Sequence, residues 1–78
     1  MTSHTLDARG LACPLPVLRA NKHLRTLAAG DELCVAVTDP AAPADFDRFC
    51  ATTGHVLVSV ETNPLDQTVT ILRLRKTG

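Results

Sequence analysis

Hydrophobic and polar residues alternate along four short segments of the chain, and a period of two is typical of β-strands. In residues 32–38 the aliphatic side chains of Leu33, Val35 and Val37 point to one side, and smaller or more polar side chains point to the other. The segments predicted as strands on this pattern are residues 4–7, 32–38, 55–62 and 68–75.

The two C-terminal strands differ in how decisive their patterns are. Val56, Val58 and Val60 share one side of the first, whereas residues 68–75 carry aliphatic side chains at both parities. The alternation therefore leaves open which side of the last strand faces the core. The turn at residues 63–66, which contains a proline, links the two strands into a hairpin.

Two further segments have the period of an α-helix. Proline is well tolerated in the first turn of a helix, where its missing N–H is not needed, and prolines stand at both predicted helix starts. Glycine, which favours helix ends, follows the two segments at Gly30 and Gly54. The predicted helices span residues 14–28 and 43–53.

The order of elements is therefore βαβαββ. The first two strands, joined by a helix, are predicted to be parallel, and the last two to form an antiparallel hairpin. Two short helices can cover only one face of a four-stranded sheet. We expect a single domain over residues 1–78 of the α/β class (an α+β two-layer sandwich), with a four-stranded mixed sheet and two helices on one face.

Composition narrows the classes of protein. The chain is 45% hydrophobic and 21% charged, as in soluble globular proteins, and its formal net charge is zero. A neutral chain is not expected to bind nucleic acid directly, because phosphate contacts need a basic excess. No apolar run has the length of a membrane span, and the N-terminus lacks the apolar stretch of a signal peptide. We expect a cytoplasmic protein with no membrane partner and mostly reduced cysteines.

Cys13 is the main candidate for chemistry. It precedes Pro14 and Pro16, so it is predicted at or near the N-cap of the first helix, where cysteine is not a preferred capping residue. The helix dipole is expected to lower the thiol pKa by roughly 0.2–1.5 units and favour the nucleophilic thiolate. Two alternatives stay open: a helix that begins only at Pro16, with Cys13 in the preceding loop, and a thiol that is simply a small buried hydrophobe.

Two charged residues are candidates for supporting Cys13. Arg9, four residues upstream, is expected to favour the thiolate further. Asp39 follows the second predicted strand, and the carboxyl ends of adjacent parallel strands lie together. Asp39 is therefore expected to share an edge of the sheet with Cys13.

Arg19, Lys22 and Arg25 recur every three residues on the first predicted helix. They form either an ordinary solvated face or a docking patch for an acidic partner that delivers its cargo to Cys13.

The other cysteines and the histidines have no pattern of their own. Cys34 and Cys50 are predicted to be core residues, and no pair of cysteines has the spacing of a dithiol or a zinc site. The histidines have no metal-ligand spacing with the cysteines. No metal and no cofactor are expected.

The segment 6–18, LDARGLACPLPVL, resembles the signature of the TusA-like (SirA/TusA/YedF) sulfur-carrier family. Further segments resemble the same family in the same order: GDEL at 30–33, TDPA at 38–41, DFDRFC at 45–50 and GH at 54–55. The resemblance covers about residues 5–75. It departs from the family in the first helix, where Asn21-Lys22 stands in place of two lysines.

The resemblance implies that Cys13 carries sulfur as a persulfide. It implies a donor protein such as a cysteine desulfurase or a rhodanese, and an acceptor protein in tRNA thiolation, molybdenum-cofactor maturation or sulfur oxidation. It also implies a monomer that acts in transient complexes. Two other hypotheses stay open: a nucleic-acid-binding or regulatory interaction module, and a thiol redox sensor that uses Cys13.

Overall fold

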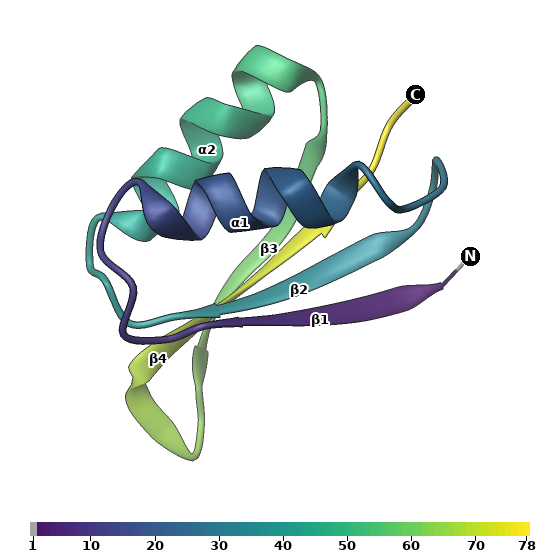
Figure 1. Ribbon diagram of the computed structural model, residues 1–78. Coiled ribbons are helices and arrows are strands. Elements are labelled where there is room, and N and C mark those ends of the chain that lie inside the picture. Colours follow the sequence, from purple (N-terminus) through teal and green to yellow (C-terminus); the bar gives the residue numbers. More distant parts are fainter. Residues whose placement is uncertain (1) are drawn as a thin grey trace.

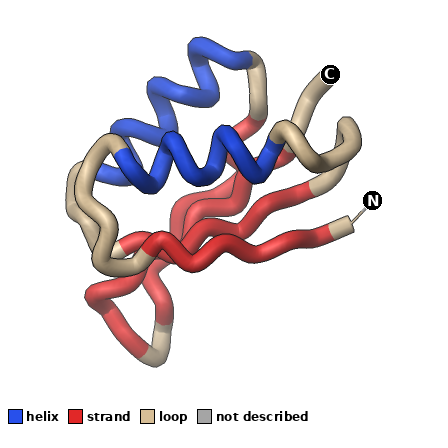
Figure 2. The backbone as a smooth tube through the Cα atoms, viewed as in Figure 1, coloured by secondary structure: helices blue, strands red, loops and turns tan. Residues whose placement is uncertain are grey.

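The computed structural model describes residues 2–78, and Met1 lies outside the described residues. The chain forms four strands and two helices, and both helices lie on one side of the sheet (Figures 1 and 2). In chain order the elements are β1 (Ser3–Ala8), α1 (Leu15–Leu24), β2 (Glu32–Val37), α2 (Ala42–Thr53), β3 (Val56–Asn63) and β4 (Asp66–Arg75).

The strands are ordered β1-β2-β4-β3 across the sheet. β1 is parallel to β2, in a register that places Ser3 opposite Glu32 and Ala8 opposite Val37. β4 is antiparallel to both of its neighbours. The predicted two-layer α+β sandwich with a mixed four-stranded sheet is confirmed. Its consequence for the site is that β1 and β2 end at the same edge, so the loops that follow them are neighbours.

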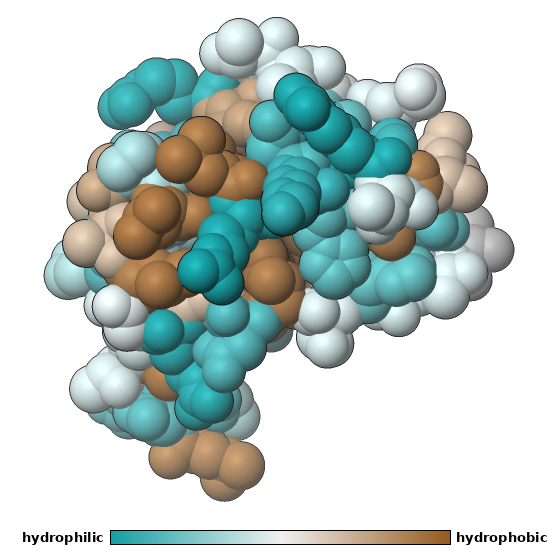
Figure 3. All heavy atoms as spheres, in the orientation of Figure 1, coloured by the Kyte–Doolittle hydropathy of each residue, from teal (hydrophilic) through white to brown (hydrophobic). Residues whose placement is uncertain are grey.

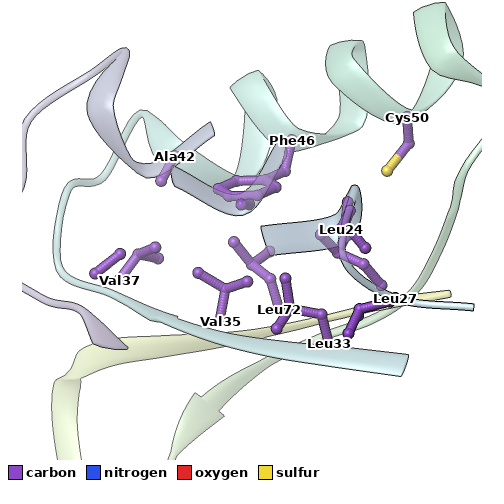
Figure 4. Close-up of a cluster of buried hydrophobic side chains, with 12 residues drawn as sticks. Leu24, Leu27, Leu33, Val35, Val37, Ala42, Phe46, Cys50 and Leu72 are labelled. Carbon is purple, nitrogen blue, oxygen red and sulfur yellow. The ribbon is translucent and has the colours of Figure 1, made fainter. Parts of the chain in front are cut away.

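The core lies between the helices and the sheet (Figure 4). Leu33, Val35 and Val37 point into it from β2, as the alternation predicts, and all three are fully buried. β4 contributes Leu72 and Leu74, which are opposite Val35 and Leu33 in the sheet. This settles the side of the last strand that sequence alternation leaves open. Each such side chain stabilises the fold by about 1.5–3 kcal/mol through burial.

Helix α1 is shorter than predicted at its C-terminal end. It ends at Leu24. Two hydrogen bonds that span three residues follow it, from the Thr26 N–H to the His23 carbonyl oxygen (3.0 Å) and from the Leu27 N–H to the Leu24 carbonyl oxygen (3.1 Å). The Asp31 carboxylate then accepts from the Ala28 N–H (3.1 Å) and so satisfies the first amide beyond these turns. Burial of Leu27 under the helices explains why the apolar pattern continued past the helix end.

Helix α2 agrees closely with its prediction. It begins at Ala42, one residue before Pro43. It ends at Thr53 and is capped by Gly54, whose φ of +85° gives the left-handed conformation that glycine adopts without strain. The Gly54 N–H donates to the Cys50 carbonyl oxygen (2.9 Å).

The prediction that Val56, Val58 and Val60 share one side of β3 is wrong, because Val56 is opposite Arg75 of β4 whereas Val60 is opposite the core residue Leu72. The register of β3 with β4 shifts between Leu57 and Ser59, so strict alternation is lost at Val58. Leu57 packs against the core, whereas Val56, Val58 and Val60 are 42%, 39% and 46% exposed. A bulge changes which side a residue faces, and single-residue alternation cannot show it.

Candidate functional site

Cys13 lies in the loop between β1 and α1 and is exposed. Helix α1 begins at Leu15, so the N-cap residue is Pro14 and Cys13 stands one residue before it. Pro16 is the second helical residue and is buried. The prediction of a thiol at or near the N-cap is therefore accurate to one residue, and a helix beginning only at Pro16 is not what forms.

Asp39 holds the Cys13 loop in place. One oxygen of its carboxylate, Oδ2, accepts from the Cys13 N–H (2.8 Å), and the other, Oδ1, accepts from the Ala41 N–H (2.9 Å). These two amides lower the pKa of Asp39, the Ala41 bond more than the Cys13 bond. Asp39 therefore joins the loop after β1 to the start of α2. The parallel pairing of β1 and β2 brings the two together, as the strand order predicts.

A groove between α1 and α2 opens beside Cys13. Pro14 and Val17 line it from one side, and α2 contributes Asp45, Arg48, Phe49 and Thr52. The Asp45 and Arg48 side chains form an ion pair one helical turn apart, with Arg48 Nη1 3.6 Å from Asp45 Oδ1. Sequence reasoning missed both as site residues. Asp45 was visible only as an acidic residue in the first turn of a helix, where it needs no other explanation.

The predicted lowering of the Cys13 pKa is wrong: its pKa is raised. The largest cause is hydrogen bonding to the Asp45 carboxylate, followed by desolvation and by the negative charges of Asp45 and Asp39. Arg48 opposes these effects. Nearby carboxylates disfavour a second negative charge, so the unloaded thiol is held in its protonated form.

The start of α1 explains why the helix does not outweigh these carboxylates. Pro14 and Pro16 have no N–H, and the Leu15 N–H is already donated to the Ala12 carbonyl oxygen (2.9 Å). The favourable charge of a helix N-terminus resides on its free amides. This helix start offers the thiol fewer of them than an ordinary one.

Arg9 does not support Cys13. Its guanidinium bonds both carboxylate oxygens of Asp7, each at 2.9 Å. Its side chain lines a groove on the opposite, uncovered face of the sheet, together with Cys34 and Ile71. Although Arg9 is only four residues from Cys13 in the sequence, the turn between them places the two side chains on different sides of the sheet.

The predicted basic stripe is exposed, and two of its members share a second groove. Arg19 and Lys22 line a shallow groove between α1 and β1, whereas Arg25 is the C-cap residue of α1 and does not line it. Leu15 and Leu18 lie in the same groove and are 44% and 55% exposed. Figure 3 shows hydrophobic residues gathered over the start of α1 and hydrophilic residues crossing its middle.

The two remaining cysteines occupy different environments. Cys50 points from α2 toward the core and is 6% exposed, as predicted (Figure 4). The prediction of a core position for Cys34 is wrong, since it is partly exposed and faces the uncovered side of the sheet. Because Leu33 and Val35 point toward the helices, the residue between them must point away.

None of the three histidines lines the Cys13 groove, although the His55 ring lies 6.0 Å from the Phe49 ring that does. His4 and His23 face each other with ring centroids 6.1 Å apart, and His55 Nδ1 accepts from the Thr77 N–H (3.2 Å). Within residues 2–78, no group of three His, Cys, Asp or Glu side chains is arranged to hold a metal ion. No helix in that range is both long and apolar enough to cross a membrane.

Comparison with known proteins gives a consistent picture. A family model described as "Sulfurtransferase TusA" matches residues 4–76. A relative from Neisseria meningitidis is 57% identical over 58 residues, 74% of this chain and 78% of that protein. The "Sulfur carrier protein TusA" of Pseudomonas entomophila is 52% identical over 54 residues, 69% of this chain and 68% of that protein. The protein of the same name from Allochromatium vinosum is 51% identical over 53 residues, 68% and 70% of the two chains.

The fold agrees with these relatives. The crystal structure of a SirA-like protein from Desulfitobacterium hafniense superimposes with a TM-score of 0.82 at 26% identity, covering 96% of this chain and 99% of that one. The family model's match runs from residue 4 to residue 76, from β1 through β4, and includes the Cys13 segment that carried the resemblance. The chain therefore belongs to the TusA sulfurtransferase family.

Proposed function

We propose that this protein is a cytoplasmic sulfur relay in which Cys13 carries sulfane sulfur as a persulfide. The observation that carries the proposal is the position of Cys13: it is exposed, it stands just before a helix, and Asp39 fixes its backbone. A carrier needs an accessible sulfur at a fixed place, and this site provides both.

Loading is a thiol–persulfide exchange. The Cys13 sulfur loses its proton and attacks the outer sulfur of a persulfide on the donor protein, where the S–S bond breaks. The donor cysteine leaves as a thiolate and takes up a proton, while a new S–S bond forms on Cys13. The transferred sulfur keeps its oxidation state, so the step needs no external oxidant or reductant. Delivery to the acceptor repeats the exchange with Cys13 as the leaving group.

The placement of the other thiols supports a carrier. Cys50 is buried, and Cys34 faces the opposite side of the sheet. Neither of these cysteines lines the groove beside Cys13. A persulfide on Cys13 therefore has no resolving thiol beside it that would release the sulfur as sulfide, and the sulfur is retained until a partner arrives.

The partners proposed are a donor, such as a cysteine desulfurase or a rhodanese, and an acceptor protein. The α1 surface suits them: the exposed Leu15 and Leu18 offer apolar contact, and Arg19 and Lys22 beside them favour an acidic rim on the partner.

The test is intact-protein mass spectrometry after incubation with a cysteine desulfurase and cysteine. We expect the chain to gain the mass of one sulfur atom, Cys13→Ser to gain none, and Cys34→Ser to gain it as the wild type does. Cys34→Ser is the matched control because it removes another solvent-accessible thiol. Equal gain by Cys13→Ser, or no gain by the wild type, would contradict the proposal.

A further inference from the structure

Two opposite charges of α2 face Cys13 in its groove. The Asp45 side chain is only 17% exposed, whereas the Arg48 side chain is 76% exposed. Their ion pair, at 3.6 Å, is longer than a hydrogen bond, and an ion pair with one largely exposed partner is weak. The thiol therefore shares its groove with a mostly buried carboxylate and with a largely exposed guanidinium.

The third charged group near Cys13 is held by two hydrogen bonds. Both carboxylate oxygens of Asp39 are occupied by backbone N–H groups, those of Cys13 and Ala41. Asp39 contributes a constant negative charge and holds the loop. Any change in the charge balance when Cys13 is loaded must then come from Asp45 and Arg48.

We propose that the Asp45 carboxylate keeps the unloaded Cys13 thiol protonated. Once Cys13 carries a persulfide, Arg48 turns from Asp45 to pair with the anionic outer sulfur. The proposal rests on the sulfur-carrier role of Cys13. It adds two residues that set the ionisation of the sulfur in its two states, one for the thiol and one for the persulfide.

The chemistry of the two sulfur species explains why the site needs both residues. A persulfide is a stronger acid than a thiol, so it is anionic at neutral pH. Its charge lies on the outer sulfur, about 2 Å beyond Sγ, which has no proton left to donate to Asp45. The long, exposed side chain of Arg48 can follow that displacement. Val17 and Phe49 line the same groove, and their apolar surface strengthens an ion pair formed against it.

Asp45 and Arg48 shift the pKa of the Cys13 thiol in opposite directions. Asp45 raises the pKa of Cys13 and Arg48 lowers it. Their variants are therefore expected to move the same measurement with opposite signs, which general damage to the fold would not do.

The first experiment follows the rate of Cys13 alkylation by iodoacetamide as a function of pH, in a Cys34→Ser background. Asp45→Asn should lower the pH midpoint by about half a unit or more, which makes alkylation at neutral pH about threefold faster. Arg48→Gln should raise the midpoint. Arg9→Gln is the matched control: it removes the same charge from a side chain bound to Asp7, and it should leave the midpoint unchanged.

The second experiment loads Cys13 chemically with inorganic polysulfide and follows alkylation of the persulfide as a function of pH. Arg48→Gln should raise the persulfide midpoint, and Arg48→Lys should restore most of the shift because it keeps the charge. Thermal melts confirm that each variant is folded, which the exposure of Arg48 favours.

The outcomes separate the two proposals. If Cys13 accepts no sulfur from desulfurase or polysulfide, the sulfur-carrier role fails. If Cys13 is loaded normally but Asp45→Asn and Arg48→Gln leave both midpoints where Arg9→Gln leaves them, or shift them in the same direction, the inference about Asp45 and Arg48 is overturned and the carrier role stands.

Discussion

The two faces of the sheet are built from the same strands, but only one of them is covered by helices. On the covered face, Leu33 and Leu72 are fully buried beneath the helices. On the uncovered face, Arg73 pairs with Glu32 (3.0 Å), and Cys34 and Ile71 remain partly exposed. The covered face provides the core, and its helices also provide the groove around Cys13. Stability and chemistry thus share one layer of the molecule.

The two solvent-accessible thiols show the difference most clearly. Cys13 lies in a loop where two carboxylates and an arginine from other elements converge. Cys34 lies in the middle of a regular strand, beside Arg73 of β4. Accessibility alone does not distinguish them. What distinguishes them is the group of charged side chains that the loops and helix starts bring to Cys13.

The largest effect is expected from removing core volume on the covered face. Leu72→Ala should lower the free energy of unfolding by about 2–5 kcal/mol, because it leaves a cavity under the helices. Ile71→Ala, its neighbour on the uncovered face, should cost about 1 kcal/mol. Urea denaturation of both variants measures the difference. Equal losses would mean that the uncovered face is itself packed in solution.

A smaller loss is expected from Asp39→Ala. This variant removes the acceptor of the Cys13 and Ala41 amides and should lower the thermal midpoint by a few degrees. It should also slow sulfur loading, because the loop is no longer fixed. Asp39→Asn keeps one oxygen acceptor and should retain more of both properties. Unchanged loading in Asp39→Ala would show that the position of Cys13 does not depend on this bond.

The same contact predicts a pH dependence of stability. The pKa of folded Asp39 is lowered, so its contribution is present above the unfolded pKa of about 3.9 and is lost as the pH falls through the folded value. Asp31 and Glu32 have lowered pKa values too and add to the same trend. The thermal midpoint should therefore decrease when the pH is lowered below about 4. Asp39→Asn should show a shallower fall, and an identical pH profile would rule out Asp39 as a source.

The smallest effect is expected on the uncovered face. Glu32 bonds Arg73 and Arg75, but all three side chains are partly exposed, so Glu32→Gln should change the thermal midpoint little and sulfur loading not at all. Mass spectrometry and a thermal melt check both. Impaired loading would indicate that a partner also uses the uncovered face.

Much of the fold was predictable because its core strands alternate cleanly. Leu33, Val35 and Val37 gave β2, and the prolines gave both helix starts. The bulge at Val58 and the early end of α1 were not predictable, since a register shift and an Asp31 side-chain bond leave no mark on apolar periodicity.

The site was predictable only in part, for a similar reason. Cys13 stands out in the sequence because cysteine is unusual so close to a helix start. Asp39 followed from the parallel pairing of two strands. Asp45 and Arg48 reach Cys13 only when α2 packs beside α1, and Arg9 is drawn away by Asp7. Side-chain partners of this kind are chosen by tertiary packing.

The two prolines at the start of α1 have a consequence for how this protein survives between encounters. Because the amides at this helix start are missing or already bonded, they stabilise the Cys13 thiolate little, and the nearby carboxylates destabilise it further. If Cys13 is the carrier, its protonated thiol is expected to react slowly with peroxides and electrophiles at neutral pH. On the proposed carrier role, sulfur transfer to and from Cys13 would then depend on groups that the partner proteins supply.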